Sequence, residues 1–178
     1  MMDLREQILS DHTRPNAVLI ADWIGSDKKR FGELMQLFLY DEHRVVQRSA
    51  WVLSMCADRH PDLVQPYLDR MLEHCNKEGV HIAVKRNVTR LLQQMPVPEA
   101  QEEAVMNLCF ESLADPKEAI AVRCFSMGIL ADLSSRYPEI RNELRHIIED
   151  ALEHQEVSAA YKSKAKRVLQ QLSKKEKQ

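Results

Sequence analysis

Residues 41–60, DEHRVVQRSAWVLSMCADRH, decide the fold of this chain. Within them Val46, Ala50, Leu53 and Ala57 follow the spacing i, i+4, i+7, i+11, which places small and apolar side chains on one face of a helix. The same spacing returns three times, each copy beginning 38 or 39 residues after the one before. The copies are Val84, Val88, Leu91 and Met95; Val122, Ser126, Ile129 and Leu133; and Tyr161, Ala165, Val168 and Leu172. A nearly constant period of this length is typical of a helical repeat protein.

The composition of the 178 residues agrees with an all-helical protein. Helix-forming residues such as Leu, Ala, Glu, Lys and Arg dominate, and only four glycines are present. The first residues lack the apolar run of a secretory signal, and no apolar stretch approaches the roughly 18 residues of a membrane span. We therefore expect a cytoplasmic protein.

Proline, aspartate and glycine mark the ends of about ten predicted helices. Pro66 predicts a kink or a shifted start in one of them. In the helix after Pro98 the expected inward residues are Ala100, Ala104, Val105, Leu108 and Cys109. We predict one domain over residues 1–172 and a charged, fraying tail over 173–178. The helices are expected at 3–10, 16–24, from Asp27 to Asp41, and at 43–59, 62–75, 80–95, 99–113, 117–137, from Pro138 onward, and from Ser158 to about Leu172.

The short links favour antiparallel helical hairpins, five in number, that bury their apolar faces only by stacking. The fold class is therefore an all-α solenoid. The hairpins resemble HEAT repeats, an armadillo-like family. The clearest copy has the turn Asp115-Pro116, then Val122-Arg123, Ser126 and Ile129. The resemblance implies a right-handed superhelix used mainly to hold other macromolecules, and it does not imply a catalytic activity. It also implies an ion pair between Arg123 and Asp115.

The charges of the predicted hairpins are unequally divided. Taken together, the second helices from residue 43 onward carry more bases than acids, and the first helices from residue 27 onward carry more acids than bases. In a HEAT-like stack the second helices line the concave face, where a basic column would attract an acidic segment or a phosphate backbone. Counting about 100° per residue from the core positions places Arg48, Val52, Met55 and Arg59 opposite the core. The candidate ligand-binding residues are Arg44, Arg48, Trp51, Arg86, Arg90, Arg123 and Arg167. The alternative is a solvated basic face that only confers solubility.

The sequence shows no catalytic or metal-binding pattern. The four cysteines, Cys56, Cys75, Cys109 and Cys124, fall at apolar or small-residue positions and are expected to be reduced core residues. The histidines lack the paired spacing of a metal site, and no Gly-rich phosphate loop occurs. We therefore expect no enzyme activity, no metal and no cofactor.

Two functions remain open. The first is a non-enzymatic binding or adaptor module that holds an acidic protein segment, with Trp51 as an aromatic anchor. The alternative is a nucleic-acid-binding protein that resembles the HEAT-like alkylpurine DNA glycosylases. Those enzymes carry aromatic residues and a carboxylate on the concave face. Here Met55 follows Trp51 by one turn, and the nearest acid is Asp58. Trp51 is equally placed to wedge between adjacent hairpins. The polar ends of the repeat array favour a monomer.

Overall fold

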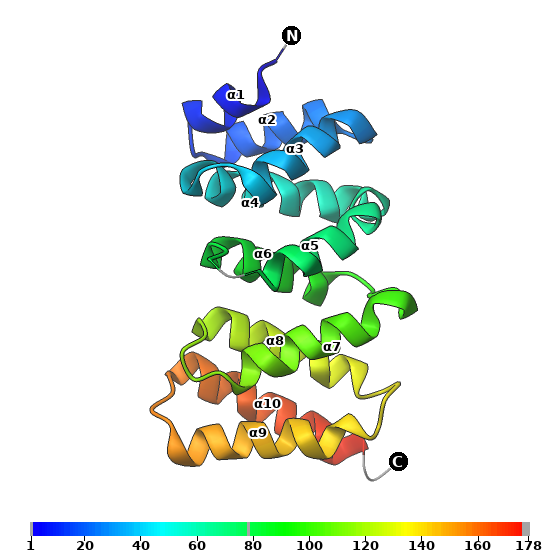
Figure 1. The fold of residues 1–178 in the computed structure, drawn as a ribbon, viewed down its shortest axis with the longest axis vertical. Helices are drawn as coiled ribbons and strands as arrows, with labels where there is room; N and C mark the ends of the chain where they lie inside the picture. The colour runs from blue at the N-terminus through cyan, green and yellow to red at the C-terminus, as the bar shows by residue number, and fades with distance from the viewer. Residues whose placement is uncertain (1, 78, 176–178) are drawn as a thin grey trace. The chain divides into compact units, whose positions relative to one another are not determined.

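The computed structural model describes residues 2–77 and 79–175. This part of the chain contains ten α-helices, α1 to α10, and two short 3₁₀ turns, η1 and η2, and no strand (Figure 1). The predicted all-α class and helix number are confirmed. The chain divides into two compact units, residues 1–91 and 92–178, whose boundary falls within α6. The single domain over 1–172 stays a prediction. None of the described helices combines the length and hydrophobicity needed to cross a bilayer.

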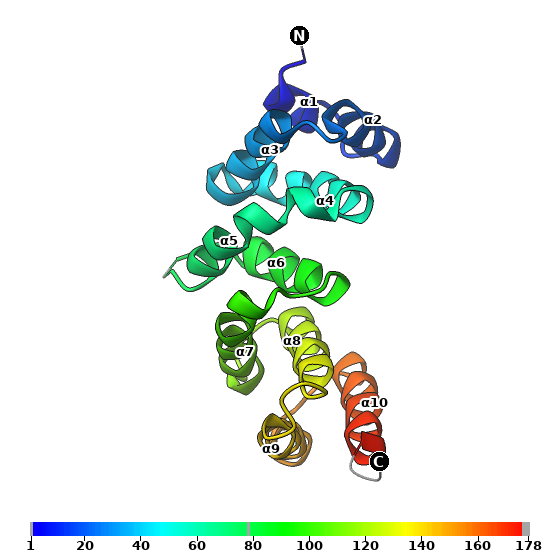
Figure 2. The same ribbon diagram turned by 90° about the vertical axis from the view of Figure 1, so that its right-hand side faces the viewer.

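In the first unit, α1 packs against α2 and α3 packs against α4, so that two hairpins form (Figure 2). The two second helices, α2 and α4, also pack against each other, as do the two first helices, α1 and α3. Each hairpin therefore gives one helix to each of two layers. The helices of this unit are α1 Leu4–Ser10, α2 Arg14–Ile24, α3 Lys28–Tyr40, α4 His43–Arg59, α5 Leu68–Cys75 and the first part of α6 Ile82–Gln94.

The first three helices begin at capping residues that the sequence indicates. The side chains of Asp3, Thr13 and Asp27 accept hydrogen bonds from backbone amides in the first turns of α1, α2 and α3. Gly25 ends α2 with a positive φ of 50°, a conformation that glycine adopts at little cost. Local sequence thus sets these helix ends.

The helix predicted over residues 62–75 is shorter in the structure. Residues Pro61–Leu63 and Gln65–Tyr67 form the 3₁₀ turns η1 and η2, and the α-helix begins only at Leu68. Pro66 has no N–H to donate, and its ring clashes with the carbonyl four residues before it. The shifted start that this proline predicts is therefore confirmed.

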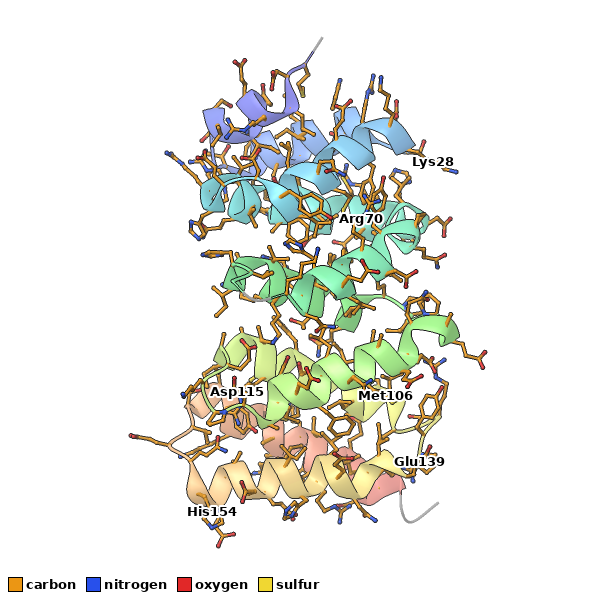
Figure 3. All side chains as sticks on the ribbon, in the orientation of Figure 1. Lys28, Arg70, Met106, Asp115, Glu139 and His154 are labelled. Atoms are coloured by element: carbon orange, nitrogen blue, oxygen red, sulfur yellow. The ribbon has the colours of Figure 1, made fainter. Side chains whose placement is uncertain are left out.

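In the second unit, α8 packs against α7, α9 and α10, while α9 also contacts α7 and α10. Figure 2 shows α8 and α10 side by side. The predicted bounds 117–137 of one helix are wrong, since α8 spans only Ile120–Leu133. Residues 115–119 form a turn before it, in which the Asp115 carboxylate accepts a hydrogen bond from Lys117 N at 2.8 Å. Figure 3 shows Asp115 at this turn. The helices are α7 Glu99–Ala114, α8 Ile120–Leu133, α9 Ile140–His154 and α10 Ala159–Lys175.

The buried face of α7 agrees only in part with the predicted one. Val105, Leu108 and Cys109 are buried as expected. Ala100 and Ala104 are exposed, whereas the side chain of Glu102 is buried. The Glu102 carboxylate accepts a hydrogen bond from the Tyr137 hydroxyl and forms an ion pair with Arg136. A buried carboxylate is tolerated only with such partners. These contacts fix the loop between α8 and α9 to the first turns of α7.

The repeated core positions are nearly all buried in both units. Val46, Ala50 and Leu53 are at most 4% exposed, and Ala57 is partly exposed. The last copy, from Tyr161 to Leu172, is fully inside the second unit. Burial of this set is the main favourable term for each unit. Helix α10 continues to residue 175, and residues 176–178 lie outside the described part of the chain, so the charged tail over 173–178 stays a prediction.

Candidate functional site

Arg48 of α4 is occupied by a contact with α1. Its guanidinium donates to the carbonyl oxygens of Ile8 at 3.2 Å and Leu9 at 2.8 Å. The last carbonyls of a helix lack partners within the helix, and α1 has no basic residue in its last turn. Arg48 supplies both hydrogen bonds and a positive charge at this end of the helix dipole. Its guanidinium therefore holds α1 onto α4.

Other residues of the predicted open face of α4 also contact the first hairpin. Val52 is 2% exposed, and α4 packs against α2. Arg59, at the end of α4, forms an ion pair with Asp22 of α2. Trp51 is partly buried and makes an edge-to-face contact with His12, the ring centroids being 5.4 Å apart. Trp51 thus packs against the preceding hairpin. This is the second of its two predicted positions, a wedge between adjacent hairpins rather than an anchor for a ligand.

Three candidate arginines of the first unit are exposed on second helices. Arg44 lies in the first turn of α4, and Arg86 and Arg90 lie one turn apart on α6. Within the described residues none of their guanidinium groups has a hydrogen-bond or ionic partner. Residues four apart on a helix have neighbouring side chains, so Arg86 and Arg90 present two cations together. Ile82, one turn earlier on the same stripe, is 50% exposed.

Arg123 lies inside the second unit with 2% exposure. It donates to the Leu113 carbonyl at 3.2 Å and to Gln155 Oε1 at 2.9 Å, and its guanidinium lies 4.7 Å from the centre of the Tyr161 ring. The prediction of an ion pair between Arg123 and Asp115 is wrong, since the Asp115 carboxylate accepts a hydrogen bond from the backbone amide of Lys117 instead. A buried guanidinium needs hydrogen-bond acceptors, and a carbonyl, an amide oxygen and an aromatic face supply them here. Arg123 therefore joins three elements of the core.

The structure also gathers residues that the sequence interpretation missed. Arg167, a candidate, is exposed on α10, and the positive charges of Lys164, Arg123 and Arg167 act on the thiol of Cys124. Burial nevertheless raises the pKa of Cys124, because desolvation outweighs those charges. Lys164 lies above Gly128 in the middle of α8. A glycine within an apolar helix was the available sequence signal.

Nucleophilic and metal chemistry find little support in the geometry. Cys56, Cys75 and Cys109 are buried free thiols, and burial raises the pKa of Cys56 to about 12. Such a thiol stays protonated at neutral pH and is a weak nucleophile. Among residues 2–77 and 79–175 no three His, Cys, Asp or Glu side chains converge as metal ligands would. From α4 onward, basic side chains outnumber acidic ones on the described second helices.

Comparison with known proteins gives one match. The family model described as HEAT repeat domain matches residues 4–172. No curated protein and no solved structure matches the chain. The match covers nearly the whole sequence and accounts for the paired helices and the 38- to 39-residue period. HEAT repeats generally form helical scaffolds that mediate protein interactions. The chain belongs to the HEAT repeat family.

Proposed function

We propose that this protein is a non-enzymatic binding or adaptor module that holds an acidic protein segment on the exposed side of its second helices. One observation supports this proposal above the others. Arg44, Arg86 and Arg90 are exposed and without partners among the described residues. A guanidinium carries five N–H donors arranged to match a carboxylate. Arginines in this state are available to an acidic ligand.

Two other arginines of the first unit, Arg5 and Arg30, are paired within it. Arg5 of α1 binds the Asp41 carboxylate with two hydrogen bonds, of 2.9 and 3.0 Å. Arg30 of α3 lies 3.6 Å from Asp27 and donates to the Trp23 carbonyl at 2.6 Å. Both of these arginines lie on first helices. The free arginines therefore do not reflect a general shortage of acids in this unit.

The stripe on α6 indicates the pattern of the ligand. Arg86 and Arg90 are like charges at i and i+4, an arrangement that costs a helix a few tenths of a kcal/mol. Two carboxylates with a similar spacing would remove this repulsion and form charge-assisted hydrogen bonds. Ile82 on the same stripe would contact an apolar residue of the ligand. The proposed segment is therefore acidic and carries an apolar residue beside its carboxylates.

A defined peptide tests the proposal. A fluorescein-labelled peptide of alternating glutamate and leucine would be titrated with the wild-type chain at about 50 and 200 mM salt, and binding would be followed by anisotropy. Replacing Arg86 and Arg90 together by Glu should weaken binding at least about tenfold, because two charge-assisted contacts become repulsive. Replacing Lys28 and Lys29 of α3 by Glu is the matched control, since it changes the net charge equally on a first helix. Figure 3 shows Lys28 at the start of α3.

The outcomes separate the proposal from its competitors. Equal losses in both double variants would mean that only net charge matters, and this would contradict the proposed face. Labelled duplex DNA, titrated in parallel, tests the nucleic-acid alternative, which depends on the same exposed arginines. Tighter binding of DNA than of peptide, with a steep loss between the two salt concentrations, would favour that alternative.

A further inference from the structure

Gly128, in the middle of α8, occupies a position that glycine does not favour. In a helix interior glycine is the least favourable residue apart from proline. A Cβ built at Gly128 would lie 2.7 Å from Lys164 Nζ and 3.2 Å from Lys164 Cε, and closer still to Gln93 Nε2. All these atoms belong to the ends of long, flexible side chains. The close approach of two helix backbones therefore does not require glycine here.

The two groups that meet over Gly128 are both hydrogen-bond donors. Lys164 comes from α10, and Gln93 comes from the last turn of α6 and lies within the second unit. Both side chains are partly buried, and in the described part of the chain neither has a hydrogen-bond or ionic partner. An ammonium group that loses water without gaining an anion is in an unfavourable position. The side-chain amide of Gln93 beside it donates hydrogen bonds as well and also lacks an acceptor.

The surroundings of the two donor groups beside Gly128 are positively charged. Cys124 precedes Gly128 by one turn of α8, and its thiol is within the electrostatic influence of Lys164, Arg123 and Arg167. Arg167 follows Lys164 by three residues on α10 and is exposed. Asp132, one turn beyond Gly128, is exposed and forms no ion pair with Lys164. Among the described residues of the second unit, no carboxylate thus satisfies the ammonium.

We propose that Gly128 is the floor of a carboxylate-binding recess, in which Lys164 Nζ and Gln93 Nε2 each donate to one oxygen of a Glu or Asp side chain. The inference rests on the proposed function, because the carboxylate belongs to the acidic segment. Arg167 stands at the edge of the recess and adds charge. One ammonium and one amide match the two oxygens of a carboxylate.

Gly128→Ala is the decisive variant. Alanine favours the helix, and the atoms that its Cβ would displace are flexible side-chain ends, so the fold should persist. The Cβ would push Lys164 and Gln93 apart and fill the recess. With the labelled glutamate–leucine peptide as the probe, we expect affinity to fall about tenfold or more. Circular dichroism would show an unchanged helix content.

Two further variants check that the loss is local. Lys164→Met removes the ammonium and should also weaken peptide binding about tenfold. Lys162→Met removes the same charge from an exposed position on the same helix and should change affinity less than twofold. If Gly128→Ala fails to fold, the comparison of Lys164→Met with Lys162→Met tests the recess in its place. Equal effects of the two lysine variants would overturn the recess.

A small carboxylate separates failure of the recess from failure of the proposed function. Sodium glutarate would be titrated into ¹⁵N-labelled protein while the side-chain amide signals of Gln93 are followed. Shifts in the wild type that are absent from Gly128→Ala support the recess even if the peptide does not bind, an outcome that would overturn only the proposed function. Peptide binding that is lost in the Arg86/Arg90 double variant but unchanged in Gly128→Ala, with no glutarate shift, would overturn the recess alone.

Discussion

Helices α6 and α8 show two different uses of a basic residue near the start of a second helix. Arg86 follows the first core position of α6, Val84, by two residues and is exposed. Arg123 follows the corresponding position of α8, Val122, by one residue and is buried. One residue turns a side chain by about 100° around the helix. Arg123 therefore faces the end of α7, while Arg86 faces solvent.

Helix α4 adds a second lesson to this comparison. Arg48 follows Val46 by two residues, the same offset as Arg86 on α6, and yet it binds the carbonyls of Ile8 and Leu9. The helix phase is equal in the two cases, and the difference comes from α1, which packs beside α4. A charge on a second helix is thus available for binding only where no neighbouring element consumes it.

The largest expected effect is that of Arg123→Met. The substitution leaves the Leu113 carbonyl and Gln155 Oε1 without a donor inside the second unit. We expect the free energy of unfolding to fall by about 3 kcal/mol, measured by urea denaturation followed by circular dichroism. Arg86→Met is the matched control and should change it by about 0.5 kcal/mol or less. Similar values for the two variants would break the comparison.

The same variant tests the predicted single domain over residues 1–172. Both tryptophans, Trp23 and Trp51, lie in the first unit, whereas Arg123 lies in the second. If the chain unfolds as one domain, the tryptophan fluorescence transition should shift together with the circular dichroism transition. A fluorescence transition that keeps its wild-type midpoint would show that the two units unfold separately.

Arg48→Met should have an intermediate effect. The substitution keeps much of the apolar stem but removes the two donors to the end of α1. We expect the free energy of unfolding to fall by about 1 kcal/mol and amide hydrogen exchange to become faster mainly in residues 4–10. Unchanged hydrogen exchange in α1 would mean that other contacts hold this helix. The guanidinium of Arg48 would then be as available to a ligand as those of Arg44, Arg86 and Arg90.

The smallest effect concerns the Arg5–Asp41 pair and depends on pH. Hydrogen bonds from the Arg5 guanidinium lower the pKa of Asp41 below its ordinary value of 3.8. The carboxylate thus adds stability above the unfolded-state pKa, and this is lost as the pH falls through the lowered native pKa. Wild type should exceed Asp41→Asn in urea midpoint at about pH 6, and the gap should close below about pH 3. A gap that is independent of pH would contradict the ion pair.

Local sequence was sufficient for much of the fold. Val46, Ala50 and Leu53 could be assigned to the core because a helix repeats its faces every few residues, whatever surrounds it. The caps at Asp3 and Asp27 were equally readable. The burial of Glu102 on α7 was not readable, because its carboxylate is paired with Tyr137 and Arg136, which come from a loop about 35 residues away. Periodicity cannot reveal such a partner.

The sequence by itself determined that the chain is a series of paired helices whose second helices together carry an excess of bases. Only the tertiary structure decided which of those bases is free. Arg48 and Arg123 are engaged by carbonyls of α1 and α7, whereas Arg44, Arg86 and Arg90 remain exposed. The physical reason is that a helix fixes the direction of each side chain locally, but its solvation depends on elements that pack from elsewhere in the chain.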